Sequence, residues 1–208
     1  MLRLPLLAAL VAILGLGAPA SQAEPVRYRA ALQPESAGAT GMGSVDVLYD
    51  PIAHTLQVLA SWSGLSGSTT VAHIHCCTAA PATVGVAVTP STLPGFPTGT
   101  NAGSYSSPLL DLGAASTYTA SFVSNAAGGV LGNAEEALIA GFDAGMAYFN
   151  IHTTAFPAGE IRGFLRAAQV PEPGTLLLVA LGLGALAWRW HGKARRAALA
   201  RTPGRRQG

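Results

Sequence analysis

The chain has 208 residues, enough for about one folded domain, and only 11% of them are charged, against roughly 25% in a typical soluble domain. Residues 24–175 carry ten acidic and four basic side chains, whereas residues 189–208 carry seven basic side chains and no acidic one. Since the acidic central region has no basic stripe, its composition argues against nucleic-acid binding.

The N-terminal segment has the three parts of a secretory signal peptide. Arg3 precedes an apolar run, and Ser21 and Ala23 occupy the −3 and −1 positions of a cleavage site. An uncleaved anchor helix is the alternative, but the run is short for a membrane span and the small exit residues favour cleavage. We therefore expect residues 1–23 to be removed and the protein to be exported.

The central region, residues 24–169, is dominated by short segments with strand patterns. Residues 43–62 alternate apolar and polar side chains on either side of Asp50-Pro51, which predicts a β-hairpin. Residues 89–104 contain three Pro and three Gly, so we expect a long surface loop there. Other strands are predicted at residues 26–32, 70–75, 85–88, 105–110, 147–152 and 161–165.

One helix is predicted between Asn133 and Gly145. Asn133 can cap its start, Glu135 and Glu136 favour the positive end of its dipole, and Gly145 can end it. Many short strands with Gly/Pro-rich joints and one short helix predict an all-β fold, an antiparallel β-sandwich. The signal peptide and a C-terminal transmembrane helix would flank this domain.

The C-terminal region combines an apolar run with a basic tail. Residues 176–188 are all apolar. A span needs roughly 20 residues, so the transmembrane helix is placed at about 174–190. The basic residues that follow predict a cytoplasmic tail.

A Pro-Glu-Pro triplet, Pro171, Glu172 and Pro173, stands just before this apolar run. The triplet is followed by an apolar helix and then by an Arg-rich end. This order resembles the PEP-CTERM sorting signal of Gram-negative bacteria, and we assign residues 170–208 to it. The resemblance implies an exosortase as partner, transient anchoring in the inner membrane and cleavage near the triplet. The protein would then pass to the cell surface or an exopolysaccharide matrix. A simple tail anchor is the alternative.

Three stretches of the central region resemble the CHRD domain family. They are VAHIH at 71–75, AGMAYFNIHT at 144–153 and FPAGEIRGFL at 156–165. The resemblance implies an extracellular β-rich module without an established enzymatic reaction. The chain departs from the usual pattern after His75, where Cys76-Cys77 replaces a Gly or small polar residue.

The AHIHCC segment, residues 72–77, is the densest cluster of potential metal ligands. On one strand His73, His75 and Cys77 share a face, and with His152 from a facing or adjacent strand they would suit zinc or copper. The alternative is structural. In that case Asn150 and His152 pin the loop 153–160 by hydrogen bonds, and Glu160 and Arg162 form an ion pair.

The two cysteines, Cys76 and Cys77, are adjacent in a chain expected to reach an oxidising compartment. A vicinal disulfide, a metal-bound pair, intermolecular bridges and two reduced thiols are all open. We favour the vicinal disulfide, which would make a rigid turn after the strand.

Two functions follow from these patterns. The first is a non-enzymatic surface or matrix protein, structural, adhesive or binding, without a cofactor, whose further partners are exopolysaccharide or other surface proteins. It is favoured because no catalytic motif is evident. The second is a copper- or zinc-binding or redox protein built on five residues: His73, His75, Cys76, Cys77 and His152.

Overall fold

Burial alternates along the first three strands as their sequence pattern predicts. The computed structural model describes residues 24–168, 181–184 and 188. The strands β1 (Val26–Pro34), β2 (Met42–Asp50) and β3 (Thr55–Ser63) form an antiparallel meander. The predicted hairpin is confirmed, and the Asp50 carboxylate closes its turn by accepting the N–H groups of Ile52 and Ala53.

The remaining long strands form the other half of the sheet. These are β4 (Thr69–Cys76), β8 (Ala147–Thr153) and β9 (Ile161–Phe164), with the short β5 (Val86–Val88) at the edge. The order is β5-β4-β8-β9-β1-β2-β3-β6, where β6 is Gly103–Ser106. Two further short strands, β7 (Leu110–Asp111) and β10 (Arg166–Ala167), pair with β3 and β1.

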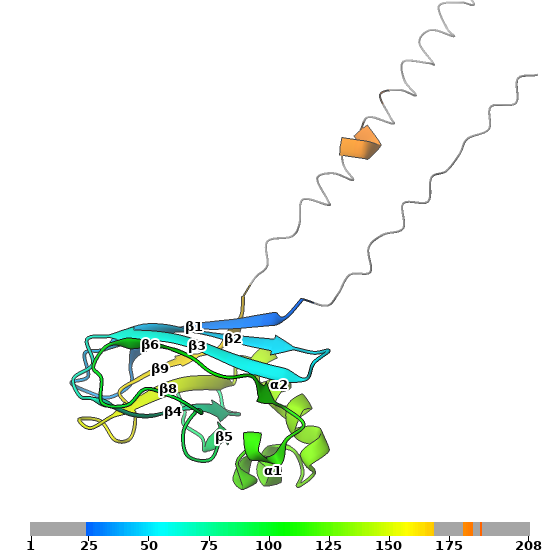
Figure 1. Cartoon of the computed structure of the whole chain (residues 1–208). Helices are drawn as coiled ribbons and strands as arrows, with labels where there is room; N and C mark the ends of the chain where they lie inside the picture. The colour runs from blue at the N-terminus through cyan, green and yellow to red at the C-terminus, as the bar shows by residue number, and fades with distance from the viewer. Residues whose placement is uncertain (1–23, 169–180, 185–187, 189–208) are drawn as a thin grey trace, which may run out of the picture. The chain divides into compact units, whose positions relative to one another are not determined.

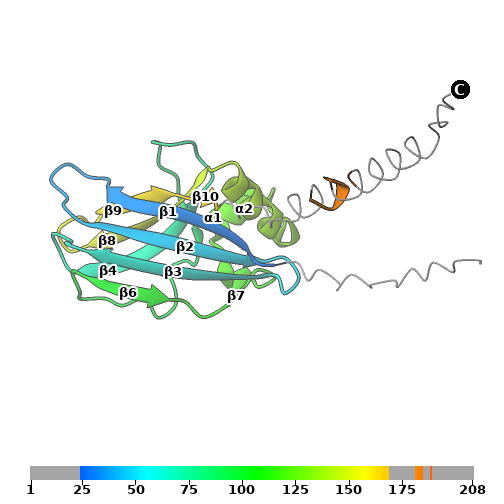
Figure 2. The ribbon, with the colours of Figure 1, turned by 90° about the horizontal axis from the view of Figure 1, so that it is seen from above.

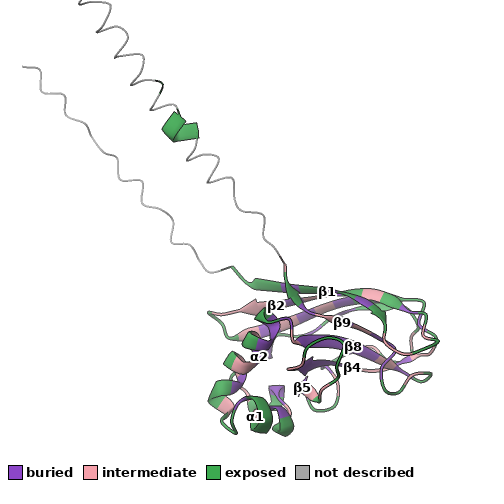
Figure 3. Ribbon diagram, turned by 180° about the vertical axis from the view of Figure 1, so that it is seen from behind, coloured by how far each residue is buried: buried purple, intermediate pink, exposed green. Residues whose placement is uncertain are grey.

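The predicted all-β antiparallel fold is confirmed, with the two halves continuous through β1. The end of β1 pairs with β9, so the sheet curls into a half-barrel whose halves lie one over the other (Figure 1). Figure 2 shows the meander from above. The core lies between the halves, and buried positions follow β4 and β8 (Figure 3). Its fully buried side chains include Leu32, Val45, Val47, Leu56, Val58, Ile74, Phe149, Ile151 and Ile161.

Two α-helices lie at one end of the half-barrel, although the sequence predicts only one (Figure 1). The predicted helix is α2 (Ala134–Asp143), and Gly145 ends it with a φ of +62°. Asn133 does not cap α2, because its side chain donates instead to the carbonyl of Ala127. The second helix, α1 (Ala120–Ala126), was missed. It is only seven residues long and has no apolar period, but Thr119 caps it.

The surface loop predicted at residues 89–104 is confirmed over most of its length, because residues 89–102 form no helix or strand and most of them are exposed, but some of its side chains are anchored in the core. Leu93 and Phe96 are buried, and the Phe96 ring lies 5.2 Å from that of Trp62 and 5.3 Å from that of Tyr105. Apolar side chains between the turn residues therefore pack this segment onto the sheet. The single strand predicted at 105–110 is divided into β6 and β7.

The chain divides into two units after Ala168. The predicted signal peptide, the Pro171–Pro173 triplet and most of the predicted span at about 174–190 lie outside the described residues. Within the residues that are described, no helix is both long enough and apolar enough to cross a membrane.

Candidate functional site

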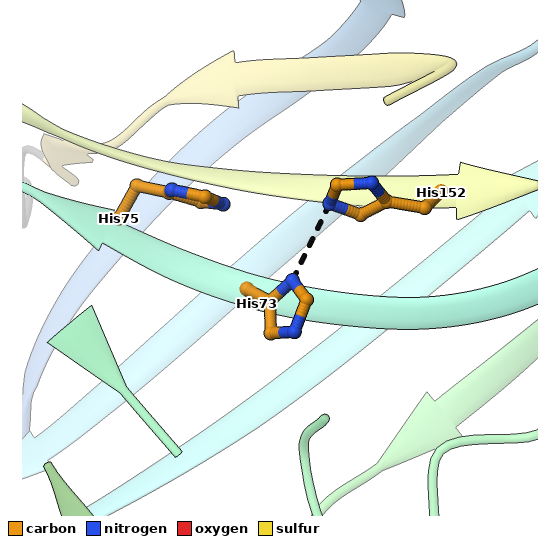
Figure 4. Close-up of side chains that lie close together, drawn as sticks. All are labelled: His73, His75 and His152. Carbon is orange, nitrogen blue, oxygen red and sulfur yellow. Dashed lines mark hydrogen bonds between the residues drawn. The ribbon is translucent and has the colours of Figure 1, made fainter. Parts of the chain in front are cut away.

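Three histidines meet on the outer face of the β4–β8 pair (Figure 4). In the antiparallel register His73 on β4 lies opposite Asn150 on β8, so His152 follows two residues further along the same face. One ring nitrogen from each of His73, His75 and His152 lies within 4.8 Å of the other two. The predicted convergence occurs between adjacent strands of one sheet half.

Hydrogen bonds to backbone carbonyls decide which nitrogen of each ring carries the hydrogen. His73 donates from Nε2 to the Ser91 carbonyl (2.8 Å), His75 from Nδ1 to that of Val84 (2.7 Å), and His152 from Nδ1 to that of Pro157 (2.8 Å). A neutral imidazole has a single N–H, so the other nitrogen of each ring has a free lone pair. These three nitrogens are Nδ1 of His73, Nε2 of His75 and Nε2 of His152.

The free lone pairs face other acceptors at two short contacts. Nδ1 of His73 lies 3.3 Å from Nε2 of His152, and Nε2 of His75 lies 3.1 Å from Oδ1 of Asn150. With the ring hydrogens on the carbonyl side, neither contact has a donor, so the cluster is a set of acceptors directed at one another.

Burial keeps the rings of His73 and His75 neutral. His73 and His75 are only 7% and 8% exposed. Desolvation lowers the pKa of His73 to about 4, against the raising effect of its bond to Ser91, and it also lowers the pKa of His75. The ring of Tyr148 stacks on His75 at a centroid distance of 4.6 Å and an interplanar angle of 4°. At neutral pH these two rings are therefore neutral nitrogen donors.

Beside the histidines lies a carboxylate that the sequence does not reveal. Glu35 accepts from Nδ2 of Asn150 (3.3 Å) and pairs with Arg162 (3.4 Å). Burial raises the pKa of Glu35, against the lowering effects of Asn150 and Arg162. Glu35 is 115 residues from Asn150, and no local pattern links them. A Cβ on Gly159 would overlap the Glu35 carboxylate, so the Gly before Glu160 makes room for it.

The predicted ion pair between Glu160 and Arg162 is wrong. Glu160 precedes β9, so the strand alternation assumed for the pair does not hold there. Its buried carboxylate accepts instead from the Thr153 hydroxyl (2.6 Å) and the backbone N–H groups of Ser66 and Gly67. Burial acts to raise the pKa of Glu160, but these hydrogen bonds outweigh it and lower the pKa. The bond from His152 to Pro157 ties the loop 153–160 to β8.

The cysteines are not part of the histidine cluster. Cys76 and Cys77 are joined by a disulfide, which packs against α2. The side chain of Cys76 is buried in the core, and Sγ of Cys77 lies 3.8 Å from the Ala137 carbonyl. Of the four predicted metal ligands, the structure brings together His73, His75 and His152, but not Cys77. The disulfide lines a pocket of about 520 Å³ with α1 and α2.

Comparisons with known families agree with this architecture. The model of the CHRD domain matches residues 25–165, and that of the PEP-CTERM protein-sorting motif matches residues 169–196. A search of curated proteins finds no match. The sorting motif is the signal that an exosortase recognises, so the protein is exported with a C-terminal anchor that is cleaved for surface or extracellular localisation. The chain belongs to the CHRD domain family.

Proposed function

We propose that this protein is a non-enzymatic binding or adhesive module of the cell surface or exopolysaccharide matrix. The observation that supports it is the junction between the domain and its sorting motif. The last strand, β10, pairs with β1, and the Ala168 N–H bonds to the Arg27 carbonyl (2.7 Å). The motif begins at the next residue. Cleavage near the Pro-Glu-Pro triplet would therefore release or transfer the domain with every strand in place.

A non-enzymatic role is supported by the surroundings of the histidines. In the described part of the chain, the rings of His54, His73, His75 and His152 bond to carbonyls, carboxylates, an amide or one another, and none bonds to a Ser, Thr or Cys side chain. Catalysis by a Ser–His, Thr–His or Cys–His pair needs such a contact, in which the histidine acts as base.

A polar hollow next to β4 supports a polysaccharide partner. Its volume is about 700 Å³, and hydroxyl and amide side chains line much of it. Such groups can exchange hydrogen bonds with the hydroxyls of a neutral sugar chain. The polar lining residues are Ser66, Ser68, Thr100, Asn101 and Thr154.

The sorting step is tested in a host that has an exosortase and secretes exopolysaccharide. We expect the wild-type chain in the surface or matrix fraction, and a Pro171→Ala/Glu172→Ala/Pro173→Ala variant in the membrane fraction. Thr202→Ala, in the basic tail, is the control and should sort normally. Equal release of the triplet variant would contradict the role of the motif.

The matrix role is tested by comparing two exposed asparagines. Asn101→Ala removes a polar group from the hollow, and Asn125→Ala removes one from α1. We expect cosedimentation with isolated exopolysaccharide to fall for Asn101→Ala only. Wild-type protein that reaches the surface but does not cosediment would refute the matrix role and leave the sorting step intact.

A further inference from the structure

We propose that His73, His75 and His152 form a transition-metal site that binds copper or zinc through Nδ1 of His73 and Nε2 of the other two rings. This goes beyond surface display and does not depend on where the protein is sorted. It rests on the convergence of three lone-pair nitrogens on one face of the β4–β8 pair.

The first argument is that the acceptors need a cation. Two pairs of acceptors lie 3.3 Å and 3.1 Å apart without a hydrogen between them, which is unfavourable unless positive charge lies in the cluster. A proton on one ring would also relieve a contact, but it would create an imidazolium beside His73 and His75, which are both more than nine-tenths buried. A metal ion engages all the free nitrogens at once.

The second argument is distance. With metal–nitrogen bonds of about 2.0–2.1 Å and tetrahedral angles, two ligand nitrogens lie about 3.3–3.4 Å apart. Nδ1 of His73 and Nε2 of His152 are 3.3 Å apart. Two ligands of one such ion are at most about 4.2 Å apart. Ring nitrogens of His73, His75 and His152 all lie within 4.8 Å of one another. A small movement of one ring is therefore enough to bring them to the distances that one ion requires.

The third argument is the support of each ring. A metal-binding histidine usually donates its other N–H to a carbonyl or carboxylate, which orients the ring and fixes its tautomer. All three rings do so here, to Val84 before β5, Ser91 after it and Pro157 in the loop 153–160. The packing of a sheet does not by itself require that three neighbouring histidines all donate to backbone carbonyls in the same way. Glu35 accepts from Nδ2 of Asn150 and so orients Oδ1 of that amide toward His75.

The ligand set selects the kind of metal. Imidazole nitrogens suit zinc and copper, whereas calcium and magnesium prefer oxygen ligands. Three protein nitrogens leave a position for water or for Oδ1 of Asn150, which already lies 3.1 Å from Nε2 of His75.

The test uses the full chain, exported with its leader, purified without a histidine tag and stripped with chelator. Copper(II) and zinc(II) are titrated separately, and bound metal is measured by elemental mass spectrometry. We expect about one ion per chain with three nitrogen ligands. His73→Gln and His152→Gln should each weaken binding about tenfold or more. His54→Gln is the matched control, because His54 is an exposed histidine that pairs with Glu135 outside the cluster.

Two further measurements keep the test decisive if a variant does not fold. Nitrogen-15 NMR of the zinc-loaded wild-type chain should show metal bound at Nδ1 of one histidine and at Nε2 of two others. A Cys76→Ser/Cys77→Ser variant should keep its metal. Wild-type protein that folds but binds no copper or zinc above the level of a nonspecific control would overturn the proposal. The proposal would also be overturned if the Cys76→Ser/Cys77→Ser variant lost its metal while His73→Gln and His152→Gln both retained it.

Discussion

At the scale of single residues, Glu160 shows how a buried charge can support a fold. Its carboxylate holds together the loop before β4, represented by Ser66 and Gly67, and the end of β8 at Thr153. Because three donors surround it, its pKa is lowered although the residue is completely buried. Glu160 is therefore a structural residue of the FPAGEIRGF stretch, which links segments that are distant in the chain.

Replacing Glu160 with Gln should destabilise the domain by about 2 kcal/mol at pH 7, because an amide cannot accept all these hydrogen bonds and places a donor against a donor. The folded carboxyl has a pKa below its ordinary 4.5, so its contribution is complete above pH 4.5 and is lost as the pH falls through the folded pKa. Urea unfolding should therefore show a difference between wild type and Glu160→Gln that narrows in acid.

Glu24→Gln is the control for Glu160→Gln, since it removes the same charge from an exposed position near the start of the domain. Its stability should match that of the wild type at every pH. A Glu160→Gln penalty that stayed constant down to pH 3 would contradict the assigned role of the charge.

At the scale of elements, α1 depends on its cap more than on its own sequence. A seven-residue helix is too short to be stable by itself, and only Phe122 within it is buried. The Thr119 hydroxyl accepts the Phe122 N–H (3.1 Å) and donates to the Val86 carbonyl on β5. One side chain thus starts the helix and attaches it to the sheet.

Thr119→Ala should lower the free energy of unfolding by about 1 kcal/mol, the usual cost of losing an N-cap. Hydrogen exchange should become faster in α1 before it does in β2 and β3. Ser116→Ala is the matched control, because Ser116 is exposed three residues earlier and should change neither quantity. Unchanged exchange in α1 of the Thr119 variant would show that the cap is unimportant.

At the scale of the whole molecule, the two sheet halves join where β9 crosses the end of β1. Gly163 permits this approach, since a Cβ there would overlap the Ala31 carbonyl and lie 2.8 Å from the Cβ of Ala30. Neither neighbour is a flexible side chain end, so the backbone itself would have to move.

Gly163→Ala should therefore destabilise the domain by about 1–3 kcal/mol, the usual cost of overpacking. Urea unfolding measures the loss, and hydrogen exchange should place it at β1 and β9. Gly132→Ala is the control, because a Cβ on Gly132 meets no atom within 4 Å, so its stability should change little. If the two variants were equally stable, the close approach would not matter to the fold.

A bound metal would act on the whole molecule as well. An ion that binds the folded chain alone stabilises it by about 2.7 kcal/mol at a hundred times its dissociation constant. Copper or zinc should therefore raise the melting temperature of the wild type, measured by circular dichroism, and of His54→Gln. A similar rise in His73→Gln would locate the binding outside the cluster.

Local patterns in the chain were sufficient for the longer strands, the sorting signal and α2. Period-two alternation and turn residues act between near neighbours, so they can be recognised without knowledge of the fold. They also placed His73 and His75 on one face of β4. Where a pattern was short or weak, as in α1 and at Leu93, packing against distant residues decided the outcome instead.

The register between β4 and β8 decided the site, and no single segment contains it. That register placed His152 beside His73, and the carbonyls of three separate loops fixed the ring hydrogens. The pairing of β9 with the end of β1 likewise brings Arg162 to Glu35 rather than to Glu160, which lies two positions away in the chain. Contacts between residues more than a hundred positions apart depend on how the halves of the sheet close. Only the folded backbone determines that closure, because it brings those distant groups within bonding distance.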